Sequence, residues 1–240
     1  MPFFPDKKIL FIHIPKNAGS SVLNFLGDRP DWDLNNQPKV YPPTFSFRSK
    51  VKSFLTFRNS ADDQKKSTYL FGTGLGSYYL QHATLSEIIS LGLLAPSDLQ
   101  QMRIFCVTRD PYDRIKSIYN YWKFNCIYSF DEFCSKVVNL ESRPYENALT
   151  HAMRTHLRPQ IDFVNIDGTL PPWLEIVEFK TLSIYLDQLG RTYYGTNNAF
   201  SSLPRVNKSS AKYDFELSNF SKSVIKSTYS CDFEAFGYHM

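Results

Sequence analysis

The amino-acid sequence predicts an α/β domain in which helices flank a central, mostly parallel β-sheet. Three short apolar runs, at residues 7–14, 103–109 and 174–179, have the uninterrupted hydrophobicity of strands that are buried on both faces. Each run is followed by a helical pattern, and repeated strand-then-helix units are typical of this fold class. A length of 240 residues suits one α/β domain, so we expect a single domain over 1–240.

The first predicted strand ends in a loop whose residues suit an anion. The run "KKILFIHI" is followed by "PKNAGSS" and then by a helical pattern. A helix N-terminus presents unpaired N–H groups and the positive end of the helix dipole. Lys16 adds a full charge, Gly19 permits close approach of a ligand, and the hydroxyls of Ser20 and Ser21 can donate. The alternative is an ordinary turn with a solvated lysine, and the pattern of a Walker A loop is absent.

A polar excursion and a capped helix follow. Residues 30–68 are polar, basic and rich in Pro and Ser, which indicates a long excursion from the domain. In "QHATLSEIISLG", Thr84 and Glu87 form a capping box, which predicts a helix that begins at about Leu85. His82 would then lie just outside this helix, in a loop where its side chain can point into a cleft.

The second predicted strand also ends beside an anion-suited group. In "RIFCVTRDPYDRIKSIYNYW", Arg109 closes the strand and Ser117 lies two turns on, in a helix predicted over 113–124. An arginine beside a helix start can hold a phosphate with paired donors. The alternative is an ion pair of Arg109 with Asp110 or Asp113. Two such strand ends in one sheet predict a ligand with two separate anionic groups.

The C-terminal third predicts two further helices. The third apolar run leads into "TLSIYLDQLG", for which Gly190 is the predicted C-terminal stop. Residues 213–230 predict one helix that ends before "CDFEAFGY".

Composition excludes several classes of protein. The balance of 27 basic and 23 acidic residues gives a net charge of +4, which is too mild to indicate a nucleic-acid or membrane-surface partner. The 4 cysteines show neither a metal-ligand spacing nor a disulfide framework, and Cys106 lies in an apolar run that predicts the core. No signal peptide or membrane-spanning segment is recognised, so we expect a cytoplasmic protein.

Five segments, in the right order, resemble motifs of the carbohydrate sulfotransferases that use 3′-phosphoadenosine 5′-phosphosulfate (PAPS), a family that includes the heparan 2-O-sulfotransferases and bacterial relatives. "FIHIPKNAGSS" resembles their 5′-phosphosulfate loop, and "RIFCVTRDPYDRIKSIYNYW" resembles their 3′-phosphate loop. "QHATLSEI", "HLRPQIDFV" and the terminal "LPRVNKSS" to "YSCDFEAFGY" resemble further family motifs, so that nearly all of the chain outside 30–68 is covered. Two positions depart from the family motifs. Lys180 occupies the position of a glutamate that is usual in the family, so no role is carried over to it. Gln81 replaces a lysine that is frequent in the family, so the resemblance does not imply a basic group at that position.

The resemblance implies a P-loop-kinase-like sulfotransferase fold and the in-line transfer of a sulfuryl group from PAPS to a hydroxyl or amine, usually of a glycan, without a metal. His82 is the implied base, because the ordinary histidine pKa of about 6.5 suits general-base work near neutrality. Lys16 is implied to stabilise the leaving phosphate, whereas Arg109 and Ser117 hold the 3′-phosphate. The implied cofactor-binding residues are Lys16, Asn17, Ala18, Gly19, Ser20, Ser21, Arg109, Ser117, Asn207, Lys208 and Ser209. The last three, with Ser210, resemble a late loop that closes over the nucleotide, and the alternative is a polar surface turn.

Other features leave alternatives open. His13 lies inside the first strand and is expected to be a buried histidine that shapes the following loop, whereas His156 and Gln160 are candidates for the acceptor cleft. Two rival functions are a catalytically inactive nucleotide- or glycan-binding relative and a P-loop-like kinase of a small metabolite. Neither the acceptor nor the oligomeric state follows from the sequence.

Overall fold

The computed structural model describes residues 3–4, 8–26, 82–90, 94, 96–139, 151–195 and 215–239. The predicted excursion at 30–68 lies outside these described residues. So does the predicted late loop, which comprises Asn207, Lys208, Ser209 and Ser210.

The described residues form an α/β structure around one sheet, with strand order β1-β2-β3-β4. The strands are β1 (Phe3–Phe4), β2 (Ile9–Ile12), β3 (Arg103–Thr108) and β4 (Leu174–Glu178). The pairs β2–β3 and β3–β4 are parallel, which confirms the predicted parallel sheet and its three strands. The short β1 pairs with β2 in the antiparallel direction and was not predicted.

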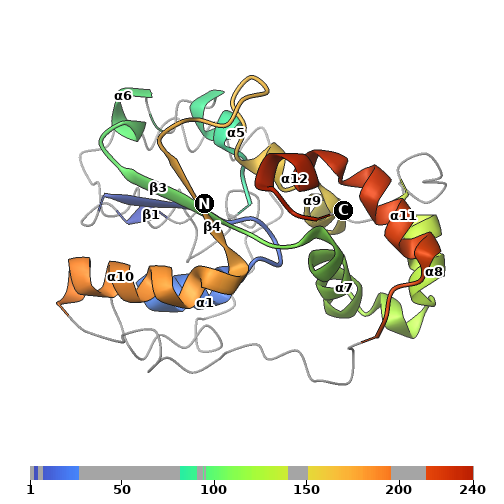
Figure 1. The fold of residues 1–240 in the computed structure, drawn as a ribbon. Coiled ribbons are helices and arrows are strands. Elements are labelled where there is room, and N and C mark those ends of the chain that lie inside the picture. Colours follow the sequence, from blue (N-terminus) through green and yellow to red (C-terminus); the bar gives the residue numbers. More distant parts are fainter. Residues whose placement is uncertain are drawn as a thin grey trace, which may run out of the picture.

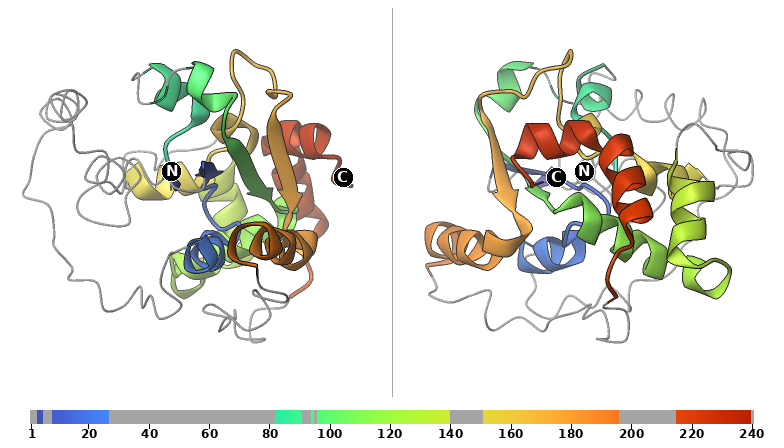
Figure 2. Two further views of the ribbon diagram at one scale, coloured as in Figure 1. Left: turned by 90° about the vertical axis from the view of Figure 1, so that its left-hand side faces the viewer. Right: turned by 45° about the vertical axis from the view of Figure 1, so that its right-hand side comes forward.

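Helices cover both faces of the sheet, which explains why the strands are continuously apolar. On one face, α1 (Gly19–Leu26) and α10 (Leu182–Tyr194) pack on side chains such as Phe11 and Phe105. On the other face, α5 (Leu85–Ser90) and α6 (Pro96–Leu99) pack on side chains such as Leu10 and Ile104. Figures 1 and 2 show α1 and α10 side by side, across the sheet from α5 and α6.

A second group of helices lies beyond the carboxyl ends of the strands, at the right of Figure 1. It surrounds an aromatic core that includes Phe133, Tyr229 and Phe233. The helices of this group are α7 (Pro111–Tyr121), α8 (Phe130–Phe133), which continues as a π-helix over Cys134–Val138, α9 (His151–Leu157), α11 (Asn219–Thr228) and α12 (Ser230–Phe236). Short 3₁₀ turns cover Phe124–Cys126, Ile161–Phe163 and Phe179–Thr181. The carboxyl edge of the sheet therefore faces this group.

Two predicted helix ends are wrong. The helix after β4 does not stop at Gly190 but runs to Tyr194, and Gly195 closes it in a left-handed conformation with φ 64°. Gly190 is a buried position inside this helix and not its end.

The C-terminal helix predicted over 213–230 is likewise not one helix. Residues 215–218 are not helical, Ser218 caps α11 at its start, and α11 ends at Thr228. "CDFEAF", which was predicted to lie outside the helix, belongs to α12. Phe233 of α12 is buried in the aromatic core, and this tertiary packing favours a second helix after the break at Tyr229.

None of the helices in the described part of the chain is long and apolar enough to cross a lipid bilayer. The described cysteines Cys106, Cys126, Cys134 and Cys231 are free thiols, and Cys106 is buried in the sheet as predicted.

Candidate active site at the carboxyl edge of the sheet

The loop between β2 and α1 is tightly wound. Lys16 and Ala18 both have left-handed backbones, with φ 68° and φ 59°, which is an uncommon state for residues other than glycine. The Ala18 carbonyl accepts the first hydrogen bonds of α1, from the N–H groups of Ser21 and Val22. Backbone strain of this kind persists only where the surrounding structure holds the strained residues in place. It is found mainly at functional sites.

The position of the His13 ring explains why residue 19 is glycine. The ring of His13 lies so close that a Cβ on Gly19 would be 1.6 Å from its Nε2 atom. His13 is 7% exposed, and its burial lowers the pKa well below the ordinary value. The expectation that His13 is a buried residue that shapes the loop is confirmed, and the role of Gly19 is to accept this ring.

Asn17 fastens the loop to the neighbouring strand. Its side chain is fully buried, and Nδ2 donates to the Val107 carbonyl at 2.7 Å and to Gln160 Oε1 at 2.6 Å. The sequence predicted only a backbone contact of Asn17 with the cofactor. The structure adds a positioning role for its side chain.

Arg109 lies where the sequence predicted, at the end of β3, and its side chain reaches the first loop. Arg109 Nη1 donates to the Lys16 carbonyl at 3.4 Å, and its guanidinium lies 4.7 Å from the ring centroid of Phe179. The alternative ion pair with Asp110 or Asp113 is not formed, because neither carboxylate lies within ion-pair distance. Asp110 instead caps α7 by accepting from the N–H groups of Tyr112 and Asp113.

Lys16 has a lowered pKa of about 8. Burial is the larger cause and the nearby charge of Arg109 is the smaller one. Its ammonium group lies 3.7 Å from the ring centroid of Tyr121, at the end of α7. Ser117 lies one turn before Tyr121 on the same helix and is half-buried. The two predicted anion loops are therefore in direct contact, and both face α7.

Three histidines form a cluster beside these loops. The ring of His82 lies 4.5 Å from that of His13 and 5.4 Å from that of His156, measured between centroids. His156 also stacks on Tyr121 at 5.5 Å, which links the cluster to the ring beneath Lys16. The sequence predicted roles for these residues separately, and the structure brings them together.

His82 is held in one orientation and in one tautomer. It lies just before α5, whose predicted capping box is confirmed: Thr84 N donates to Glu87 Oε2 at 2.7 Å, and Glu87 N donates to Thr84 Oγ1 at 3.0 Å. His82 Nδ1 lies 2.9 Å from the His13 carbonyl, which can only accept, so Nδ1 carries the proton and Nε2 keeps the lone pair. Burial lowers the pKa of His82 to about 4, so the ring is neutral at pH 7.

Arg114 is a central residue of the site that the sequence reasoning missed. It is 1% exposed, and its guanidinium donates to carbonyls of three separate residues, Pro15 at 3.2 Å, His156 at 2.8 Å and Arg158 at 2.9 Å. The available signal was its spacing, because Arg114 lies four residues before the buried Ile118 on the apolar face of α7.

Gln160 does not line an acceptor cleft. It is fully buried, and its carboxamide contacts Asn17 and the backbone of Arg109. Asp232 of α12 in turn accepts from the N–H groups of Gln160 and Ile161, at 2.8 and 2.9 Å. Neither the bridging role of Gln160 nor the contribution of Asp232 was predicted.

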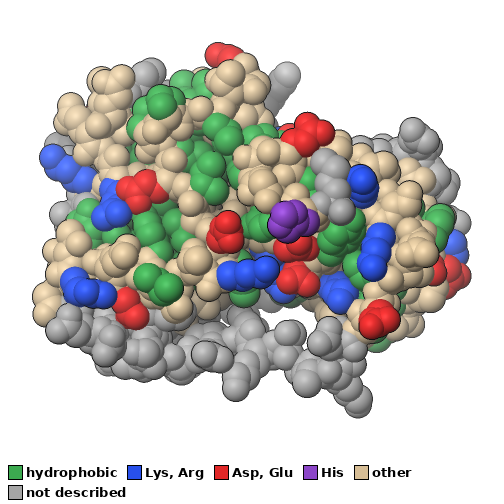
Figure 3. Space-filling view, viewed as in Figure 1, with side chains coloured by type: hydrophobic (Ala, Val, Ile, Leu, Met, Phe, Trp, Pro, Cys, Tyr) green, Lys and Arg blue, Asp and Glu red, His purple; other side chains and the backbone are tan. Residues whose placement is uncertain are grey.

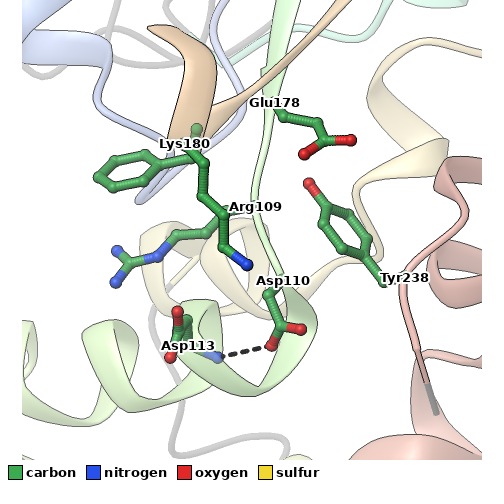
Figure 4. A pocket seen from close by; sticks show the side chains of 7 residues that line it. Arg109, Asp110, Asp113, Glu178, Lys180 and Tyr238 are labelled. Carbon is green, nitrogen blue, oxygen red and sulfur yellow. Dashed lines mark hydrogen bonds between the residues drawn. The ribbon is translucent and has the colours of Figure 1, made fainter.

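A pocket opens beside Arg109, between the ends of β3 and β4. It is lined by Arg109, Asp110, Asp113, Glu178, Phe179, Lys180 and Tyr238. Figure 4 shows the hydroxyl of Tyr238 pointing toward Glu178 and the amine of Lys180 reaching down toward Asp110. Tyr238 also donates to Thr108 Oγ1 at 2.9 Å, which holds the C-terminal segment against β3. Lys180, to which the sequence assigned no role, is thus one of the residues that line this pocket.

The charges around the site are mixed. In Figure 3, basic and acidic side chains are interspersed over the described part of the face, without one extended basic area. Among the described residues, no group of three or more His, Cys, Asp or Glu side chains is arranged to hold a metal ion. Comparisons with protein-family models, with curated proteins and with solved structures found no significant match.

Proposed function

We propose that this chain is a sulfotransferase with a P-loop-kinase-like fold, which moves a sulfuryl group from PAPS to a hydroxyl or amine of an acceptor, with a glycan as the favoured class. The observation that carries the proposal is the pairing of Lys16 and Arg109 at adjacent strand ends. Their loops touch, and no carboxylate of the described residues forms an ion pair with either side chain. Both cations are partly buried, and although Asp113 and Asp110 lie near enough to raise the pKa of Arg109, neither pairs with it, which favours an anionic ligand.

The residues present fit a ligand with two anionic groups. Lys16 lies in the loop that precedes α1, and Ser20 and Ser21 lie in the first turn of α1, where the helix dipole adds to the attraction for an anion. Arg109 Nε is buried and has no hydrogen-bond partner among the described residues, which leaves a donor for a second group. We assign the first set to the 5′-phosphosulfate, and Arg109 with Ser117 to the 3′-phosphate.

His82 is the proposed general base. When bound, PAPS supplies the sulfuryl group and a phosphate leaving group. His82 Nε2 accepts the proton of the acceptor's hydroxyl or amine, while the hydrogen bond of Nδ1 to the His13 carbonyl keeps the ring in the required tautomer. Lys16 stabilises the negative charge that develops on the leaving side, and one such preorganised donor is worth about 3–4 kcal/mol in the transition state.

Calorimetry tests the proposed ligand. We expect 3′,5′-bisphosphoadenosine to bind at least about tenfold more tightly than 5′-AMP, because one additional charged group engages Arg109. Arg109→Ala should remove most of this difference. Arg191→Ala, an exposed arginine on α10, is the matched control and should leave it unchanged. Equal affinity of the wild-type protein for the two nucleotides would overturn the proposal.

A transfer assay tests the reaction. Labelled sulfate from PAPS should appear on at least one member of a panel of glycans, amino sugars and small phenols. Nucleotide binding without transfer to any of them would favour the catalytically inactive relative. Transfer of phosphate from ATP would favour the small-metabolite kinase.

A further inference from the structure

The side chain of Gln160 contacts both anion loops. Gln160 Oε1 accepts from Asn17 Nδ2 at 2.6 Å and from the Arg109 N–H at 2.9 Å, and Gln160 Nε2 donates to the Arg109 carbonyl at 2.8 Å. The carboxamide of Gln160 therefore forms hydrogen bonds with the N–H and the carbonyl of Arg109 and also with the side chain of Asn17 in the first loop. Neither loop can shift relative to the other without breaking one of these buried contacts.

Gln160 is itself held by the C-terminal helix pair. Asp232 is fully buried, and each of its carboxylate oxygens accepts one backbone N–H, from Gln160 and from Ile161. Its burial raises the pKa, while the nearby charge of Arg114 opposes that rise. Because α12 packs on the aromatic core, the position of Gln160 is set by the main body of the protein rather than by the loops it joins.

We propose that Gln160, held by Asp232, is a positioning residue that couples the two anion-binding loops. A ligand that occupies both loops then binds more tightly than its separate halves predict, because a contact that holds one loop in place also holds, through this bridge, the loop that the second contact needs. The inference rests on the proposed function for the identity of that ligand. Coupling between two sites is commonly about 5–150-fold in affinity.

The experiment is a ligand cycle on the full chain. Affinities for adenosine, 5′-AMP, 3′-AMP and 3′,5′-bisphosphoadenosine are measured by calorimetry. Each phosphate raises the affinity over that of adenosine by some factor. The coupling is the factor by which the gain of the bisphosphate exceeds the product of the gains of the two monophosphates. Gln160→Met keeps the side-chain length and removes every hydrogen bond of the carboxamide. We expect it to lower the coupling roughly tenfold while each monophosphate retains its affinity within about threefold.

Controls separate coupling from general damage. Gln101→Met, at an exposed position before β3, is the matched control and should retain the wild-type coupling. Asp232→Asn, which loses one of the two acceptor oxygens, should lower the coupling to an intermediate value. If Gln160→Met does not fold, Gln160→Glu takes its place, because it retains both acceptor contacts and loses the donor to the Arg109 carbonyl.

The possible failures are distinguishable. Wild-type coupling in the folded Gln160 variant would overturn the positioning role and leave the proposed function standing. A wild-type protein that does not distinguish the bisphosphate from 5′-AMP would overturn the proposed function. In that case, hydrogen exchange at the Arg109 amide tests the inference, because it needs no ligand. Exchange as slow in the Gln160 variant as in the wild type contradicts the bridge. Exchange that is at least about tenfold faster in the variant supports it.

Discussion

At the scale of single residues, the structure changes what is expected of the proposed base. A base with the ordinary histidine pKa of about 6.5 would place the acid limb of the rate profile within one or two units of that value. The structure places His82 against His13 and His156, and burial of the ring lowers the pKa of His82 to about 4. A buried imidazole is neutral over most of the pH range because charging it would cost solvation energy. His82 is therefore in its base form, although it is a weak base in the ligand-free protein.

The pH dependence of kcat/KM follows from two groups. His82 must be neutral, so activity is present above pH 4 and is lost as the pH falls through about 4. Lys16 must be charged, so activity is present below pH 8 and is lost as the pH rises through about 8. Because kcat/KM reports the free enzyme, we expect a bell with limbs near these two values.

Lys16→Arg is the variant that assigns the alkaline limb. A guanidinium stays charged throughout this range, so the fall above pH 8 should disappear even if the maximal rate is lower. An unchanged alkaline limb in this variant would show that a group other than Lys16 titrates there.

Replacement of His82 tests the base directly. We expect His82→Ala to lower kcat by roughly 10²–10⁴-fold, the usual contribution of one general acid–base group. Its affinity for 3′,5′-bisphosphoadenosine should change little, since the cofactor residues lie on the other loops. His239→Ala, an exposed histidine near the C-terminus, is the control. Normal turnover in His82→Ala would show that His82 is not the base and would make His156 or His13 the candidate.

At the scale of elements, the start of α5 decides where His82 lies. The capping box of Thr84 and Glu87 starts α5 three residues after His82, and the His13 carbonyl holds the ring. A second capping box, formed by Ser129 and Glu132, starts α8 in the other group of helices. The two boxes have the same local chemistry, but only the first adjoins the candidate site.

This pair of caps allows a matched test. Thr84→Ala should cost about 1 kcal/mol of stability, as is usual for an N-cap, and should also lower kcat because the loop that carries His82 loses its anchor. Ser129→Ala should lower the thermal stability by a similar amount and leave kcat unchanged. Denaturation and steady-state kinetics measure the two effects. Equal loss of kcat in both variants would mean that α5 has no special role in positioning His82.

At the scale of the whole molecule, Arg114 joins the sheet to the second group of helices. Its guanidinium, carried by α7, connects the loop after β2 to the last turn of α9 and to the residue that follows α9. Burial lowers the pKa of Arg114, and Asp232 is the largest of the groups that oppose this shift. Loss of this side chain would leave three buried carbonyls without their donors.

Arg114→Met should therefore destabilise the fold strongly. Each buried carbonyl left unsatisfied costs about 1–3 kcal/mol, so a loss of at least about 3 kcal/mol is expected. In a chain of this size that lowers Tm by roughly 6–12 °C, measured by calorimetry. Arg191→Met, in which an exposed arginine is replaced, is the control. A change in Tm below about 2 °C for Arg114→Met would contradict this role.

Part of the site could be predicted because its signals are local. The three parallel strands, the loop that carries Lys16 and the capping box before His82 each depend on patterns a few residues long. The helix ends at Gly190 and near residue 230 were predicted wrongly because packing, and not the local pattern, decides them. A glycine in a buried helix position and one in a left-handed cap look the same in a sequence.

The sequence by itself determined the fold class and placed Lys16 and Arg109 at the ends of two strands of one sheet, because hydrophobic periodicity and turn chemistry are written in consecutive residues. Only the tertiary structure decided that these loops touch, that His13 requires Gly19, and that the rings of His82 and His156 meet. It also decided that Gln160 reaches Asn17 across 143 positions of the chain and that Arg114 reaches Pro15 across 99. Contacts at such separations depend on how whole elements pack, and no local pattern encodes that packing.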